Sequence, residues 1–214
     1  MVAQLRRALS DVAVEPMRRR HLHGVMAIEE AVYPRAWSPA LFAAELAGGP
    51  QRWYRVALAP GSRLGGMVAR RQVVGYAGLV LQGREAHVTT VAVHPAQHRR
   101  KVATRLLVSL LRHARDTDAA AATLEVRVGN RGAQRLYATF GFAPVGVRPR
   151  YYPETGEDAL IMWVHELQGP AFGRLLDAQA ARIDEPGGAS GAPDLHVPWV
   201  RGRVGLDGRV GEKG

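Results

Sequence analysis

The stretch 91–104, which reads V-A-V-H-P-A-Q-H-R-R-K-V-A-T, constrains the fold of this chain more than any other segment. An apolar, β-branched run ends at Pro95, a basic turn follows at 98–101, and apolar residues then recur at helical spacing up to Ala114. This pattern predicts a strand that leads through a basic loop into a helix. Because the first turn of a helix has unpaired N–H groups and a partial positive charge, the loop is a natural anion site. We expect this loop to bind a phosphorylated ligand.

Composition narrows the class of protein. The chain has 214 residues, of which 47% are apolar, so we expect one sizeable domain with a packed core. It has no cysteine, which excludes disulfides, thiolate metal sites and a cysteine nucleophile. No apolar run approaches the ~20 residues of a membrane helix, so we expect a soluble, cytoplasmic protein without a membrane partner. The net charge of +10 has two possible explanations. It is a by-product of an arginine-rich composition, or it serves to attract a polyanion such as a nucleotide, RNA or the ribosome surface.

The chain divides into two parts by composition. Residues 1–167 carry the periodic apolar patterns and are expected to form one domain. Residues 168–214 begin with a short helix candidate and then become rich in glycine and proline, with no apolar period. Such a composition predicts a flexible C-terminal extension.

Within the first part, strands and helices are expected in the order β-α-α-β-β-β-α-β-α-β-β. Three consecutive strands followed by alternation predict an α/β domain, with a mixed twisted sheet that carries helices on both faces. The expected strands cover residues 12–17, 53–58, 73–81, 87–93, 123–128, 143–148 and 159–165. The expected helices cover residues 19–32, 38–46, 102–115 and 130–140.

Four segments carry a resemblance to a known family. They read I-E-E-A-V-Y-P-R-A-W-S (28–38), V-A-V-H-P-A-Q-H-R-R-K-V-A-T-R-L-L (91–107), L-E-V-R-V-G-N (124–130) with R-L-Y-A-T-F-G-F (135–142), and R-Y-Y-P-E-T-G-E-D-A-L-I-M (150–162). Together they resemble the GNAT superfamily of acyl-CoA N-acyltransferases, and within it the RimI type that acetylates ribosomal-protein alanine. The resemblance implies the GNAT fold and direct acetyl transfer from acetyl-CoA to a protein N-terminal α-amine, without a metal. It also implies a ribosomal protein as a possible partner, with nucleic acid near only through the ribosome.

The resemblance also assigns roles to residues. Glu125 would be the general base, and Tyr137 the general acid toward the departing thiolate. The residues that would bind the cofactor are Val91, Ala92 and Val93 along the pantetheine arm, Arg99, Arg100, Lys101, Val102, Ala103 and Thr104 around the pyrophosphate, and Asn130. The residues that would line the peptide end of the cleft are Tyr33, Trp37, Tyr151 and Tyr152.

One position departs from the family pattern, because Lys101 stands where the first glycine of the loop is expected. Glycine at such a position permits unrestricted φ and a close approach of backbone to phosphate. Lysine could crowd the pyrophosphate, or it could point outward and add a charge.

Other interpretations remain open at this stage. Glu125 could be a strand-surface ion pair, and Tyr137 could pack its ring in the core. The chain could act on a small-molecule amine or a protein lysine instead of an α-amine. It could also be a non-catalytic module that binds CoA or the ribosome.

Overall fold

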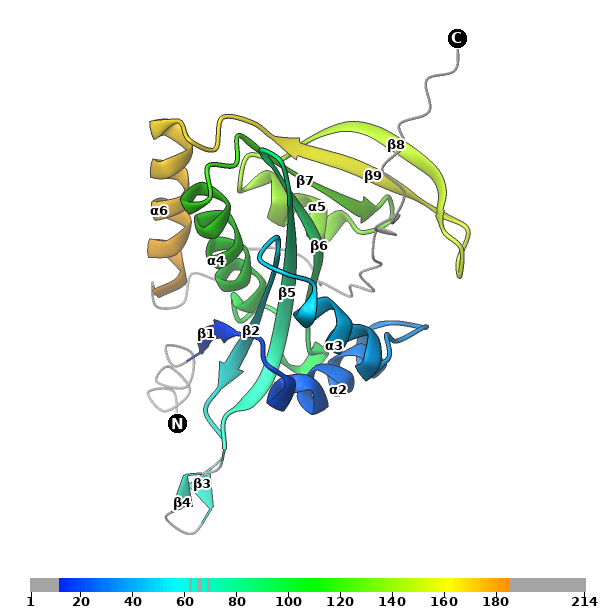
Figure 1. The fold of residues 1–214 in the computed structure, drawn as a ribbon, viewed down its shortest axis with the longest axis vertical. Coiled ribbons are helices and arrows are strands. Elements are labelled where there is room, and N and C mark those ends of the chain that lie inside the picture. The colour runs from blue at the N-terminus through cyan, green and yellow to red at the C-terminus, as the bar shows by residue number, and fades with distance from the viewer. Residues whose placement is uncertain (1–11, 62, 65–66, 69, 185–214) are drawn as a thin grey trace.

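The computed structural model describes residues 12–61, 63–64, 67–68 and 70–184 (Figure 1). Its centre is a seven-stranded sheet in the order β1-β2-β5-β6-β7-β9-β8. Neighbouring strands run antiparallel except β6 and β7, which are parallel. The strands are β1 (Ala13–Pro16), β2 (Arg52–Ala59), β5 (Gln72–Gln82), β6 (Glu85–Val93), β7 (Ala121–Arg127), β8 (Ala143–Tyr152) and β9 (Glu157–Val164).

Helices cover both faces of this sheet, as the sequence predicts (Figure 1). On one face α4 lies across β2, β5 and β6, and α6 packs against α4. On the other face α2 contacts β5 and β6, with α3 beside it. The helices are α2 (Leu22–Val32), α3 (Pro39–Ala47), α4 (Val102–Asp116), α5 (Arg131–Ala138) and α6 (Pro170–Asp184), with short 3-10 turns η1 (Arg19–His21) and η2 (Pro95–Gln97).

The apolar stripe of α4 explains why this helix lies flat on the sheet. Leu106, Leu107, Leu110 and Leu111 are fully buried, and each such side chain contributes about 1.5–3 kcal/mol relative to an exposed one. The helix also approaches β5 closely at Gly75, where an added Cβ would lie 2.9 Å from Val102 Cγ1. The first turn of α4 is therefore held firmly against the sheet at the end of β6.

Helix starts and stops follow the local sequence. Ser38 accepts a hydrogen bond from the Leu41 amide at 3.2 Å and caps α3, with Pro39 as the first helical residue. Asn130 caps α5 in the same way through the Ala133 amide at 3.0 Å. Gly141 follows α5 with φ +83°, a value that glycine adopts without strain.

The structure differs from the sequence prediction in two places. A small two-stranded sheet, β3 (Arg63–Leu64) with β4 (Met67–Val68), lies between the expected strands 53–58 and 73–81, where no strand is expected. The helix candidate at 170–183 is confirmed as α6, but this helix packs against α4 and buries Phe172 and Leu176, so it belongs to the folded domain and not to a flexible extension. The remainder of the extension, 185–214, lies outside the described residues.

Candidate active site

The parallel strands β6 and β7 separate after a short ladder. Their pairing covers only Glu85–His87 with Ala121–Thr123, although β6 continues to Val93 and β7 to Arg127. A register shift between Gly78 and Leu79 of β5 adds a bulge to β6 nearby. Beyond this ladder, the backbone N–H and C=O groups on the facing edges of β6 and β7 form no hydrogen bonds between the two strands. An extended ligand with amide groups can pair there in place of a strand.

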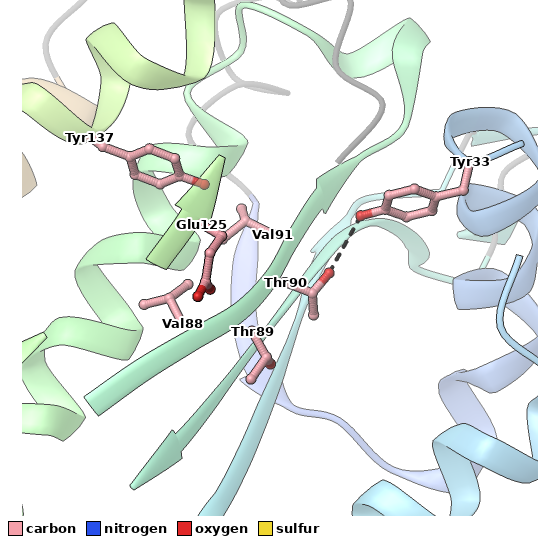
Figure 2. Close-up of a pocket in the computed structure, with 7 residues that line it drawn as sticks. All are labelled: Tyr33, Val88, Thr89, Thr90, Val91, Glu125 and Tyr137. Carbon is pink, nitrogen blue, oxygen red and sulfur yellow. Dashed lines mark hydrogen bonds between the residues drawn. The ribbon is translucent and has the colours of Figure 1, made fainter. Parts of the chain in front are cut away.

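A small pocket lies where the two strands part (Figure 2). Glu125 and Tyr137 enter it from one side, and Tyr33 enters from the other. The Tyr33 hydroxyl and Thr90 Oγ1 are 3.4 Å apart and share a hydrogen bond. The lining residues are Tyr33, Val88, Thr89, Thr90, Val91, Glu125 and Tyr137. The pocket thus brings together the two residues expected to catalyse and one expected to contact the acceptor.

Glu125 is a nearly buried carboxylate, because its side chain is only 7% exposed. Its Oε2 lies 2.7 Å from His87 Nε2, and its Oε1 lies 3.3 Å from a guanidinium nitrogen of Arg148. Burial alone raises the pKa of Glu125, but the hydrogen bond and charge of His87 and the charge of Arg148 outweigh it. The net pKa lies below its ordinary value. The carboxylate is therefore ionised at neutral pH and able to accept a hydrogen bond in the pocket.

Tyr137 reaches the pocket from α5 and is 1% exposed. Burial raises its pKa well above the ordinary value, and the nearby Tyr33 and Tyr152 add to the effect. The phenol therefore keeps its proton at neutral pH. It can act as a hydrogen-bond donor or a general acid toward a group that develops negative charge.

Asn130 holds the start of α5 and has a free donor. Its Oδ1 accepts the Ala133 amide, while its buried Nδ2 has no hydrogen-bond partner among the described residues. A buried amide N–H without a partner is costly in a finished structure. Contact of this donor with a cofactor stays a prediction.

The second end of the site is the loop between β6 and α4. Arg99 and Lys101 have φ values of +59° and +56°, the left-handed conformation that glycine favours. Lys101 is the N-cap of α4 and gives its amides no side-chain cap. The Lys101 Nζ instead donates a hydrogen bond to the Arg182 carbonyl of α6. The lysine thus takes the backbone conformation of the expected glycine and directs its side chain toward α6.

This loop suits the pyrophosphate of a CoA molecule. A 15-residue helix that begins without a side-chain cap presents first-turn amides to an anion. Arg99 is exposed and Arg100 donates to Gln97 Oε1, so both guanidinium groups lie on the same loop. The slot between β6 and β7, the α4 amides and the Asn130 donor together fit an extended, phosphorylated ligand.

Three expected acceptor-contacting residues lie away from the pocket lining. Trp37 packs its ring 5.3 Å from that of Phe42, and its amide donates to Glu29 Oε2 at 2.8 Å. Tyr151 is partly exposed and lies against the ring of Tyr152. Tyr152 is fully buried, and its hydroxyl has no hydrogen-bond partner among the described residues. Contact of Trp37, Tyr151 and Tyr152 with an acceptor stays a prediction.

The burial of Tyr152 has a structural cause in Arg127. The guanidinium of Arg127 lies 4.1 Å over the Tyr152 ring. It also donates to Glu154 at 2.6 Å and to Glu157 at 2.8 Å. These contacts hold the β8–β9 hairpin on β7, and the hairpin places Arg148 beside Glu125.

Several residues around the pocket were not found from the sequence. His87 and Arg148 contact Glu125, Thr89 and Thr90 line the pocket, and the fully buried Glu29 fixes the loop before Trp37. The position of Glu29 on the apolar face of its helix, one turn after Val25 and next to Ile28, is a visible signal for this residue. The pairing of His87 with Glu125 depends on the register of two strands more than 30 residues apart, which no local pattern reveals.

Comparisons with known proteins agree with this geometry. The acetyltransferase (GNAT) family model matches residues 22–142, so the chain belongs to the GNAT family of acetyltransferases. It is 34% identical over 155 residues to a Bacillus subtilis (strain 168) protein named, provisionally, as a ribosomal protein bS18-alanine N-acetyltransferase. That match covers 72% of this chain and 96% of the relative.

A second relative and a solved structure extend the comparison. The chain is 42% identical over 130 residues to a Mycobacterium tuberculosis (strain ATCC 25618 / H37Rv) protein named N-alpha-acetyltransferase RimI, with 59% of this chain and 73% of the relative covered. The crystal structure of the Escherichia coli ribosomal-protein-S18-alanine N-acetyltransferase matches with a TM-score of 0.61 and 25% identity. It covers 72% of this chain and 94% of that chain. The expected fold and enzyme class are therefore confirmed.

Among the described residues, no helix has the length and apolar character needed to cross a membrane.

Proposed function

We propose that this acetyltransferase moves an acetyl group from acetyl-CoA to the α-amine of a protein N-terminus, with the N-terminal alanine of a ribosomal protein as acceptor. The relatives named above carry that activity in their names, and the segments that resemble them surround the pocket. The single observation that carries the proposal is the meeting of Glu125 and Tyr137 at the opening between β6 and β7. A ribosomal acceptor implies action in the cytoplasm.

The donor binds along the separated strands in this proposal. Backbone groups of Val91 to Val93 pair with the pantetheine arm, and Asn130 Nδ2 donates to it. The loop at 99–104 holds the pyrophosphate with its amides and with the charges of Arg99 and Arg100. When bound, acetyl-CoA supplies the activated thioester, whose carbonyl carbon is the electrophile. A backbone N–H where β6 ends, with Val93 as the candidate, stabilises the oxyanion.

Glu125 accepts the proton that prevents the acceptor ammonium group from attacking the thioester. An ammonium has no lone pair, and an α-amine has an ordinary pKa of about 7.7–8.0, so a large part is protonated at neutral pH. Glu125 is ionised and faces the pocket, so it accepts the proton from the amine directly or through one water. The neutral amine then attacks the thioester carbonyl, and no acyl-enzyme is formed.

Tyr137 completes the reaction on the leaving side. As the tetrahedral intermediate collapses, its positively charged nitrogen gives up a second proton to water, the C–S bond breaks, and the thiolate sulfur gains negative charge. The buried Tyr137 phenol donates its proton to that sulfur and later regains one from solvent. Tyr33, held by Thr90 on the opposite wall, lies where the first residue of the acceptor enters.

A peptide with a free N-terminal alanine and one internal lysine tests this proposal. We expect acetyl-CoA-dependent addition of one acetyl group, located by fragmentation at the α-amine. The same peptide with a blocked N-terminus is the matched control and should gain no mass. Acetylation at the lysine would contradict the proposed acceptor class, and no gain on either peptide would contradict protein N-terminal acetylation of alanine.

A further inference from the structure

His87 is the histidine that contacts Glu125. It is the last residue of β6 that pairs with β7, opposite Thr123. Its Nε2 lies 2.7 Å from Glu125 Oε2, and its side chain is 17% exposed. Glu125 lines the pocket and His87 does not, so His87 contacts the carboxylate from behind.

We propose that His87 is a positioning residue that donates its Nε2 proton to Glu125 and keeps this carboxylate ionised and directed into the pocket. The proposal rests on the proposed function, in which Glu125 accepts the proton of the amine. An ionised carboxylate only accepts hydrogen bonds, so Nε2 must carry the proton in this contact. The contact therefore also fixes the tautomer of the imidazole.

The burial of the two partners explains why His87 matters more than Arg148. The Arg148 side chain is 55% exposed and lies 3.3 Å from Glu125, so solvent and salt weaken its effect. The His87 side chain is mostly buried, and its Nε2 contacts Glu125 Oε2 at a shorter distance than the one between Arg148 and Glu125 Oε1. Without it, a flexible and nearly buried glutamate would have one exposed partner to orient it.

The other groups around Glu125 do not replace this contact. Arg148 and Tyr152 face it from β8, Tyr137 from α5, and Tyr33 from the loop after α2. The tyrosines bear no positive charge in either protonation state. Burial by these neighbours pushes the pKa of Glu125 up, and the His87 hydrogen bond is the largest influence that lowers it. His87 thus opposes the protonation that the closed pocket favours.

Two amide substitutions separate this role from simple packing. In His87→Gln the amide nitrogen takes the place of Nε2 and can still donate to Glu125. In His87→Asn the shorter side chain ends near the position of Nδ1 and does not reach. Both are polar and neutral, so a comparison of their thermal unfolding midpoints controls for folding.

The first readout is the titration of the Glu125 carboxyl carbon by carbon-13 NMR, with Glu125→Gln to assign the signal. We expect the titration midpoint in His87→Asn to rise by about one pH unit, and that in His87→Gln to stay near the wild-type value. The second readout is steady-state transfer to the alanine peptide. We expect kcat to fall about tenfold in His87→Asn with the KM for acetyl-CoA unchanged, and to recover in His87→Gln.

The outcomes separate this inference from the proposed function. An unchanged Glu125 titration in His87→Asn would overturn the role of His87, whatever the activities. Equal loss of kcat in both variants with wild-type titrations would also overturn it, because the loss would then come from packing. If the wild-type protein does not acetylate the peptide, the proposed function fails, while the titration still decides whether His87 holds Glu125 ionised.

Discussion

The two ends of the site are built in different ways. The phosphate end comes from one continuous stretch, in which β6 ends, a basic loop turns and α4 begins. The acceptor end is assembled from β6, β7, β8, α5 and the loop after α2, which are far apart in the sequence. Affinity for the donor thus depends on local backbone geometry, whereas the chemistry depends on tertiary register.

This difference makes the two ends respond differently to substitution. Backbone amides and the charges of Arg99 and Arg100 hold the phosphate in the proposed mechanism, whereas the Lys101 side chain points toward α6, so a change at Lys101 removes little. Side chains do the chemistry at the acceptor end, and each has few partners. We therefore expect large effects on turnover around Glu125 and small effects on binding around Lys101.

The largest effect is expected for Glu125→Gln. This change keeps the shape but removes the ionised acceptor of the amine proton, so kcat should fall about 100-fold or more, while the KM for acetyl-CoA changes little. Steady-state kinetics with the alanine peptide measures both. Glu85→Gln, at an exposed position of β6, is the matched control and should behave like the wild type. A normal kcat for Glu125→Gln would remove Glu125 from the mechanism.

Tyr137→Phe comes next in size. The ring remains in its buried place, but the proton for the thiolate is lost, so we expect kcat to fall about tenfold or more with little change in stability. The rate of CoA release measures the expected fall in turnover, and the thermal unfolding midpoint measures the expected small change in stability. Tyr54→Phe, which removes a buried tyrosine hydroxyl outside the pocket lining, is the matched control and should leave the rate of thiolate release unchanged. If Tyr137→Phe turned over normally, the residue would serve packing alone.

The same difference explains what the sequence could predict. Strand, basic loop and helix at the phosphate end were found from periodicity, because 3.6-residue spacing and helix caps are local properties. Glu125 and Tyr137 were found through resemblance to a family. His87 and Arg148 were missed because their contact with Glu125 arises from a short parallel ladder and from a hairpin that Arg127 holds in place.

The helix α6 itself is predicted, but its packing on the domain is missed for a related reason. The sequence does not show that α4 offers a surface on which Phe172 and Leu176 become buried. Composition alone cannot reveal that surface. The conformation of Lys101 was likewise beyond prediction, because the Arg182 carbonyl that receives its Nζ comes from α6.

The effect of Glu125→Gln on the free energy of unfolding is expected to be moderate and to depend on pH. The pKa of Glu125 is lower in the folded protein, so its ionised form stabilises the fold above the unfolded pKa of about 4.3. That contribution is lost as pH falls through the folded pKa. We expect Glu125→Gln to cost about 1 kcal/mol at pH 7 relative to wild type, and less at pH 3. Denaturant unfolding of both proteins at pH 7 and pH 3 measures the loss in free energy of unfolding caused by the substitution. A larger loss at pH 3 than at pH 7 would contradict a lowered pKa of Glu125 in the folded protein.

The smallest effect is expected for Lys101→Gly. Glycine relieves a left-handed φ that costs a lysine roughly 1 kcal/mol, but it also removes the contact with α6. Because the lysine side chain points toward α6, acetyl-CoA affinity should change by less than about threefold. Isothermal titration calorimetry checks this, with Lys101→Met as a control that keeps the strained backbone. Much tighter binding by the glycine variant would mean that the lysine obstructs the pyrophosphate.

The central claim is that donor and acceptor meet where β6 and β7 separate. Hydrogen exchange with a conjugate of CoA and an alanine peptide tests it most directly, because bound ligand amides should protect the strand edges. We expect slowed exchange in the amides of residues 88–93 and 99–104 on binding, and little change in α6. Slowed exchange confined to other segments would contradict the claim and place the reaction elsewhere.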